Sequence, residues 1–179
     1  MMVEYHVKPL ITEDEIAIKI NVLAAQINRN FKDTEKLLVV GLLRGSFVFI
    51  ADLTRKLTIP IEVDFIVVSC YGNATTRSRN VRIIKDLDDK ICGKDVLLVE
   101  DIIDTGYTLS KLVHLLKNRG PKRLEICTLL NKPSRREIEI PINYCSFNIE
   151  DEFVVGYGMD YAQNNRNLPF IGTVHLNKY

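Results

Sequence analysis

Short, continuous apolar runs alternate along the chain with stretches whose apolar residues recur every three or four positions. The runs predict buried strands at residues 37–43, 62–69, 81–84, 95–99, 124–130, 153–155 and 171–176. The helical spacing predicts one helix after the capping-box pair Thr12 and Glu15, a second over 47–57, and a third over 109–116 that ends before Gly120.

Strands that alternate with helices predict an α/β fold, with a mainly parallel central sheet flanked by helices and joined by right-handed crossovers. No repeat or linker divides the chain, so we expect a single domain over residues 1–179. Ligands of such folds bind at the carboxyl ends of the strands. Three polar segments fall there: "RGS" at 44–46, "EDIIDTGYT" at 100–108 and "NKPSRR" at 131–136.

Composition narrows the class of protein. A hydrophobic content of 46%, a charged content of 26% and a net charge of +1 are ordinary for a globular domain and give no case for bulk binding to nucleic acid or membrane. The four cysteines form no Cys-x-x-Cys pair and the three histidines lack zinc spacing, so we expect reduced, mostly buried cysteines in a cytoplasmic protein. The first ten residues lack the apolar core of a signal peptide, and no apolar run approaches about 18 residues.

The segment 105–108 has the composition of an anion site. A strand–loop–helix junction presents free backbone N–H groups, Gly106 allows close approach, and Thr105 and Thr108 add hydroxyls. The alternative is that Thr108 merely caps the helix. The segment lacks the Gly-Lys-Ser/Thr ending of a P-loop.

Glu100 and Asp101 precede this segment. Carboxylates beside a phosphate either accept hydrogen bonds from sugar hydroxyls or hold Mg²⁺ that the ligand also coordinates; the alternative is that they are solvated at a sheet edge. An Asp-x-Asp nucleophile pair is excluded because Asp101 and Asp104 are three positions apart. We therefore expect a phosphorylated sugar bound with a metal.

The stretch "VLLVEDIIDTGYTL" resembles the phosphoribosyl-pyrophosphate (PRPP) motif of the type I phosphoribosyltransferases. The chain resembles the bacterial hypoxanthine(-guanine) phosphoribosyltransferases from about residue 5 to its end, through "VGLLRGSFVF", "VRIIKDLD", "LLNKPSRRE" and "DEFVVGYGMDYAQNNRNLP". The resemblance implies the type I fold, with a small hood from the N- and C-terminal segments. It also implies purine salvage: Mg²⁺-dependent transfer of 5-phosphoribosyl from PRPP to N9 of hypoxanthine or guanine, giving IMP or GMP and pyrophosphate.

The resemblance also implies roles for individual residues. The PRPP-binding set is Leu43, Arg44, Gly45, Glu100, Asp101, Asp104, Thr105, Gly106, Tyr107, Thr108 and Arg166. Within it, Glu100 and Asp101 would hold the ribose hydroxyls directly or through Mg²⁺, and Asp104 would be the catalytic candidate near the purine N7. Arg44 and Arg166 would bind the pyrophosphate, and the peptide between Leu43 and Arg44 is typically cis in the family.

For the base, the resemblance implies that Lys132 recognises the 6-oxygen, Phe153 stacks on the ring and Val154 supplies backbone contacts. Asp160 would serve both a second metal and the purine donors. The pattern alone favours other interpretations, with Lys132 as a solvated loop residue and Phe153 as core. Arg135 we interpret, with its neighbour Arg136, as surface charge or a subunit contact.

The polar loop 70–80 resembles the family's mobile lid. Relatives usually carry Ser-Tyr where this chain has Cys70 and Tyr71, so the serine hydroxyl contact is in doubt while Tyr71 can keep its role. A closed lid would exclude water from an activated sugar.

Three alternatives stay open on the sequence. The first is a PRPP-binding regulatory protein of the same fold, which commonly adds a nucleic-acid-binding module or lacks the base-recognition residues. The second is a relative that acts on xanthine or a pyrimidine, and the third is a nucleotide-binding domain without chemistry. The partners we expect are PRPP and a 6-oxopurine, with no nucleic acid and no membrane, in a homodimer or homotetramer.

Overall fold

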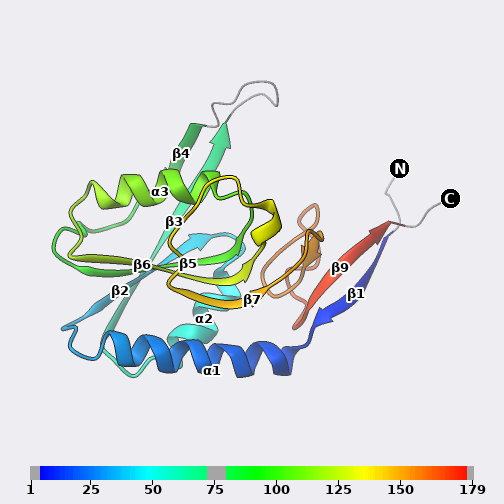
Figure 1. Cartoon of the computed structure of the whole chain (residues 1–179), viewed down its shortest axis with the longest axis horizontal. Coiled ribbons are helices and arrows are strands. Elements are labelled where there is room, and N and C mark those ends of the chain that lie inside the picture. The colour runs from blue at the N-terminus through cyan, green and yellow to red at the C-terminus, as the bar shows by residue number, and fades with distance from the viewer. Residues whose placement is uncertain (1–4, 72–79, 177–179) are drawn as a thin grey trace.

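The computed structural model describes residues 5–71 and 80–176. The elements in chain order (Figure 1) are β1 (Tyr5–Ile11), α1 (Glu13–Asn30), β2 (Leu37–Leu43), α2 (Phe47–Thr54), β3 (Ile61–Tyr71), β4 (Asn80–Lys85), β5 (Asp95–Ile103), α3 (Tyr107–Lys117), β6 (Arg123–Asn131), the 3-10 turn η1 (Pro133–Arg135), β7 (Tyr144–Asn148), β8 (Val154–Val155) and β9 (Ile171–Leu176).

The central sheet has six strands in the order β4-β3-β2-β5-β6-β7. Neighbours from β3 to β7 run parallel, and only β4, on the edge, runs antiparallel to its partner β3. This confirms the predicted mainly parallel α/β sheet. The continuous apolar runs arise because these strands are covered on both faces.

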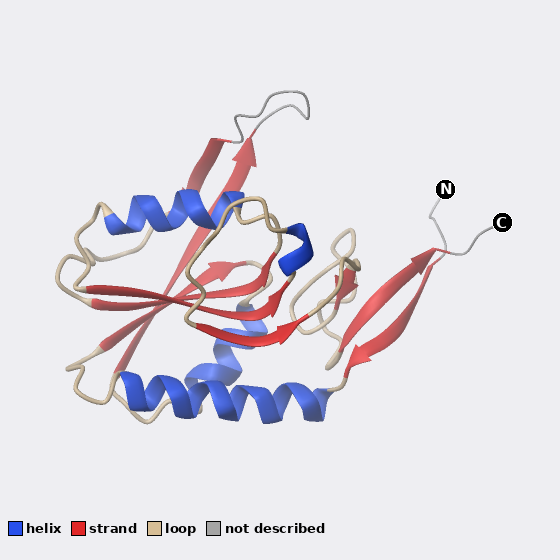
Figure 2. Ribbon diagram, in the orientation of Figure 1, coloured by secondary structure: helices blue, strands red, loops and turns tan. Residues whose placement is uncertain are grey.

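Helices cover both faces of this sheet (Figure 2). On one face, α1 and α2 pack through Ile16 and Phe49 against side chains that include Leu97. On the other face, α3 packs through Leu112 against side chains that include Leu98. Successive residues of β5 thus point into two separate cores, as the alternation of side chains along a strand requires.

A second, three-stranded sheet with the order β1-β9-β8 stands beside the first. Its strands are antiparallel, and the pairing of Tyr5 with Leu176 brings the first and last described strands side by side (Figure 1). We call this sheet, together with the connecting segment 156–170, the hood. It confirms the small unit of N- and C-terminal segments that the resemblance implied.

The crevice opens where β2 and β5 separate. Their ladder ends at the pair Gly41 and Val99, whereas β2 stays paired with β3 as far as Leu43 and β5 with β6 as far as Ile103. The chain leaves β2 through α2 toward β3 and leaves β5 through α3 toward β6, so the two crossovers move apart. This is the topological switch point at which open α/β sheets bind their ligands.

Several expectations were wrong in detail. β5 does not end at Val99 but continues to Ile103, so Glu100 and Asp101 lie in a strand rather than in a loop. α2 ends at Thr54 instead of residue 57, because the next N–H groups bond three residues back and tighten the chain into a turn.

The cysteines also depart from expectation. Cys127 is buried, but Cys92 and Cys145 are exposed. The expectation that the cysteines are mostly buried is therefore wrong for these three. Cys145 lies on β7, an edge strand that the apolar pattern did not predict. Within the described residues, no helix is long and apolar enough to cross a membrane.

Candidate active site

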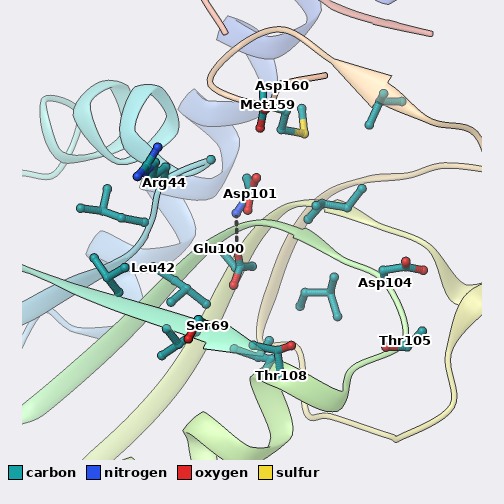
Figure 3. A pocket seen from close by; sticks show the side chains of 18 of the residues that line it. Leu42, Arg44, Ser69, Glu100, Asp101, Asp104, Thr105, Thr108, Met159 and Asp160 are labelled. Atoms are coloured by element: carbon teal, nitrogen blue, oxygen red, sulfur yellow. Dashed lines mark hydrogen bonds between the residues drawn. The ribbon is translucent and has the colours of Figure 1, made fainter. Parts of the chain in front are cut away.

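A cavity of about 820 Å³ occupies the crevice between β2 and β5 and is bounded on one side by the hood. Its size is in the usual range for small-molecule sites. Of the predicted site residues, those that line it are Leu43, Arg44, Gly45, Glu100, Asp101, Asp104, Thr105, Gly106, Thr108, Lys132, Phe153, Val154, Asp160 and Arg166. Figure 3 shows Glu100 and Asp101 near the centre, with Arg44 on one side and Asp104 and Thr105 on the other.

The turn after β2 is held tightly against β5. The peptide bond between Leu43 and Arg44 is cis, as the resemblance led us to expect, and Ser46 closes the turn by donating from Oγ to the carbonyl of Leu42 over 2.6 Å. A Cβ on Gly45 would lie 1.7 Å from Oδ2 of Asp101. A side chain at this position would therefore displace the carboxylate of Asp101.

Glu100 and Asp101 form an uncompensated pair of carboxylates. Glu100 is buried, with 8% of its surface exposed. Burial raises the pKa of Glu100 well above its usual value and the neighbouring Asp101 raises it further, although the Asp101 N–H donates to Oε1 over 3.2 Å. Within the described part of the chain, no lysine, arginine or histidine forms an ion pair with either group. The pair is thus prepared for a hydroxyl donor or a cation.

Next to these acids lies the N-terminus of α3. Gly106 is its N-cap and has a φ of +89°, and a Cβ there would lie 2.5 Å from the carbonyl oxygen of Ile138. α3 begins at Tyr107, so Thr108 lies inside the first turn and the alternative that Thr108 is the cap is wrong. The helix start and its positive dipole end therefore face the cavity, where an anion is stabilised.

Lys132 and Phe153 also line the cavity. Lys132 is buried, with 8% exposure, and its Nζ lies 3.8 Å from Oδ1 of Asp151. Phe153 is 56% exposed and makes an edge contact with Tyr161, with ring centroids 5.5 Å apart. The pattern-based interpretations are thus reversed: the lysine is not a solvated loop residue, and the phenyl ring is not core. Val154, by contrast, is buried.

The hood contributes a polar pair that had been assigned separate roles. Nη2 of Arg166 lies 2.6 Å from Oδ1 of Asp160, whose Oδ2 accepts from the backbone N–H of Gln163 over 2.7 Å. Gln163 also accepts from Nη1 of Arg44 over 3.4 Å, so it connects the hood to the turn after β2. Asp160 and Arg166 do come together, but as partners of each other.

Asp104 lies at the rim, about half exposed, and accepts from Nε of Arg135 over 3.3 Å. Ten lining residues are missing from the set predicted on the sequence, among them Ser69, Met159 and Gln163. Oγ of Ser69 is buried and has no hydrogen-bond partner within the described residues. Its position at the carboxyl end of a predicted parallel strand was the available signal, whereas no sequence pattern pointed to Gln163.

The lid assignment stays a prediction. Cys70 and Tyr71 are the last residues of β3, while residues 72–79 of the expected lid lie outside the described part. Tyr107 is the first residue of α3, between two residues that line the cavity.

Comparison with known proteins gives a consistent result. A sequence model of the phosphoribosyl transferase domain matches residues 7–162. The chain is 54% identical over 177 residues to the hypoxanthine phosphoribosyltransferase of Haemophilus influenzae, covering 98% of this chain and 99% of that protein. It is 47% identical to the hypoxanthine-guanine phosphoribosyltransferase of Bacillus subtilis, over 93% of this chain and 92% of that one.

Among solved structures, a hypoxanthine-guanine phosphoribosyltransferase from Bacillus anthracis superimposes with a TM-score of 0.91 at 46% identity, covering 95% of this chain and all of that one. Fold, cavity and domain match define a type I phosphoribosyltransferase. The chain belongs to the bacterial hypoxanthine(-guanine) phosphoribosyltransferases.

Replacing the carboxyl of Glu100 by a neutral amide should make the folded protein more stable. Because burial raises the pKa of Glu100 above its value in the unfolded chain, ionisation of this carboxyl costs stability as the pH rises. Glu100→Gln should therefore raise the free energy of unfolding by about 1 kcal/mol at pH 8, measured by urea denaturation with EDTA and without ligand. Glu35→Gln, at an exposed position, serves as the matched control and should change little; a loss of stability in Glu100→Gln would contradict the argument.

Proposed function

We propose that the protein transfers the 5-phosphoribosyl group of PRPP to N9 of hypoxanthine and of guanine, releasing pyrophosphate and forming IMP or GMP for purine salvage. The observation that carries this proposal is the uncompensated pair Glu100 and Asp101 directly beside the start of α3. One ligand can bind both features if its phosphate lies at the start of α3 and its diol or bound metal meets the two carboxylates. The names of the similar proteins support the choice of a 6-oxopurine.

For the ribose, Glu100 and Asp101 accept hydrogen bonds from the 2- and 3-hydroxyls or bind the Mg²⁺ that accompanies PRPP. Within the described residues, no three carboxylate, histidine or cysteine side chains converge to form a closed metal cage. Mg²⁺ is commonly held by one or two carboxylates together with phosphate oxygens of the substrate, so this donor set fits the ion. Bound there, Mg²⁺ would neutralise charge on the departing pyrophosphate.

For the 5-phosphate, backbone N–H groups from 105–108 donate at the start of α3, and the hydroxyls of Thr105 and Thr108 add to them. Gly106 lets the phosphate approach the backbone. The carbonyl of Thr105 accepts from the N–H groups of Glu137 and Ile138 over 3.0 and 3.1 Å. This cradle is therefore fixed before the ligand arrives, which lowers the entropy cost of binding.

For the pyrophosphate, the turn 43–45 and two arginines supply the donors. Arg44 comes from the turn after β2 and Arg166 from the hood, and both line the cavity. Asp160, which pairs with Arg166, would be the carboxylate that holds a second Mg²⁺, and Arg166 would then be available to the pyrophosphate. An arginine can bind phosphate oxygens in a bidentate manner.

For the base, the ammonium of Lys132 donates to the 6-oxygen and Phe153 offers its exposed ring for stacking, with backbone contacts at Val154. Adenine presents an amino donor at the same position, so a buried lysine would face a second donor with no acceptor between them. Such unpaired groups cost a few kcal/mol in a dry pocket, which rejects adenine.

Between ribose and base lies Asp104, which accepts the hydrogen bond or the proton of the purine N7 as N9 attacks C1 of the ribose. Bond exchange at C1 gives the sugar oxocarbenium character, and the nearby carboxylates stabilise that positive charge. Lid closure by the segment that begins at Cys70 and Tyr71 would exclude water from this sugar. We further expect one domain over 1–179, a cytoplasmic location, and a homodimer or homotetramer.

The test is an assay of pyrophosphate release with Mg²⁺, PRPP and each of hypoxanthine, guanine, xanthine and adenine. We expect turnover with hypoxanthine and guanine, and little with adenine. PRPP binding without turnover of any base would instead indicate the regulatory protein, and turnover confined to xanthine would move the protein to another substrate class.

Asp104→Asn should reduce kcat by about 100-fold or more while PRPP affinity changes by less than about threefold, because the carboxylate acts mainly on the transition state. The measurement pairs steady-state kinetics with titration calorimetry of Mg-PRPP. Equal losses in turnover and affinity would assign Asp104 to ground-state binding.

Lys132→Ala should lower kcat/KM for hypoxanthine by about 100-fold and narrow the preference over adenine, because the variant removes the donor that reads the 6-oxygen. Competition between the two bases in one reaction measures the preference. An unchanged ratio of hypoxanthine to adenine turnover would remove Lys132 from base recognition.

A further inference from the structure

We propose that Arg135 is a positioning residue for Asp104 and that, through Asp151, it links Asp104 to Lys132, so that the two groups that read neighbouring atoms of the purine are held at a set separation. The inference rests on the proposed function. It assigns a role to an arginine that the sequence led us to interpret as surface charge or a subunit contact.

The four side chains form a continuous line of alternating charge. Nε of Arg135 lies 3.3 Å from Oδ1 of Asp104, and Nη1 of the same guanidinium lies 3.6 Å from Oδ2 of Asp151. The other oxygen of Asp151, Oδ1, lies 3.8 Å from Nζ of Lys132. One guanidinium and one carboxylate therefore bridge the two proposed base-reading residues.

The two bridging residues lie outside the cavity lining. Asp104 and Lys132 are among the described residues that line the cavity, whereas Arg135 and Asp151 are not among them. The two bridging residues are thus placed to act on their neighbours, while Asp104 and Lys132 remain available to the base.

Backbone hydrogen bonds hold the two ends of this line in register. The N–H of Lys132 donates to the carbonyl of Ile103 over 3.0 Å, and the N–H of Glu137 donates to that of Thr105 over 3.0 Å. Asp104 lies between these two carbonyls, and Arg135 lies in η1 between the two donors. These backbone hydrogen bonds hold the segments that carry Asp104 and Arg135 next to each other, and the two side chains are therefore paired.

The chemistry of the base explains why a set separation is useful. N7 and O6 of a 6-oxopurine lie on the same edge of the ring. A lysine that donates to O6 and a carboxylate that serves N7 must therefore act side by side. If Asp104 moved freely, it could turn toward the lysine or into solvent, and even a 1 Å displacement of a reacting group can cost about 100-fold in rate.

Stability is not the reason for the pair. The side chains of Arg135, Asp104 and Asp151 are 47%, 45% and 55% exposed, and ion pairs this exposed contribute little to the free energy of unfolding. Loss of Arg135 should therefore change turnover without changing the melting temperature, which separates a positioning role from a structural one.

The experiment is a double-mutant cycle on the full chain, with kinetics for hypoxanthine and PRPP. Arg135→Met, which keeps an unbranched apolar stem but removes the guanidinium, should lower kcat about tenfold with KM for PRPP within about twofold, and Arg135→Lys should recover part of the loss. On the Asp104→Asn background, Arg135→Met should change kcat by less than about twofold, because the group it positions is gone.

Arg119→Met is the matched control. Arg119 forms a similar pair with Asp86, at 2.7 Å, beyond the far end of α3, and its loss should leave kcat unchanged. Asp151→Asn should raise KM for hypoxanthine severalfold, because the neutral amide no longer forms an ion pair with the ammonium of Lys132. An unchanged KM would overturn the part of the proposal that reaches Lys132.

Two results would overturn the role of Arg135: parental kcat in Arg135→Met, or the same fold loss on both backgrounds. These results differ from failure of the proposed function, in which the parent protein itself shows no PRPP-dependent turnover of a 6-oxopurine. That outcome would overturn both.

Discussion

The separation of β2 from β5 is the constraint on which the rest of the structure depends. Up to Gly41 and Val99 the two strands share a ladder, and beyond that point each stays paired only with its outer neighbour. The backbone at 100–103 therefore reaches past the sheet with one side open, and its polar side chains can enter the crevice. Because the two crossovers leave in opposite directions, one face carries α1 and α2 and the other carries α3, and neither covers the opening.

The same separation explains how acids and an anion site can be neighbours. The strand places Asp101 against the turn after β2, where a Cβ on Gly45 would meet its carboxylate. Five residues after Asp101 the chain turns at Gly106 and presents the N-terminus of α3. In the proposed function, repulsion between carboxylates and phosphate is avoided because the two meet different parts of an extended ligand. The carboxyl of Glu100 is then buried for the sake of binding rather than stability.

Sequence reasoning predicted the parallel sheet, its order of elements and most of the cavity lining, because each depends on short-range pattern or on an ordered set of motifs. It failed where burial is decided by distant partners. Phe153 follows the pattern of core, yet more than half of its surface is exposed. The segment around Lys132 has the composition of a loop, yet Lys132 is buried. Its N–H donates to the carbonyl of Ile103, and its ammonium lies near the carboxylate of Asp151. The edge strands β1 and β7 alternate in polarity or lie half exposed, so no continuous apolar run indicates them in the sequence.

The pairing of β1 with β9 has a consequence for how the protein is made. The hood joins the first described strand of the chain to the last, so its sheet cannot close until residues 171–176 have left the ribosome. The central sheet, the turn after β2 and the start of α3 are all encoded earlier and are free to pack sooner. On a growing chain, the sheet that carries Glu100, Asp101 and the start of α3 can thus fold before the hood, and the hood's side of the cavity forms only after β9 has emerged.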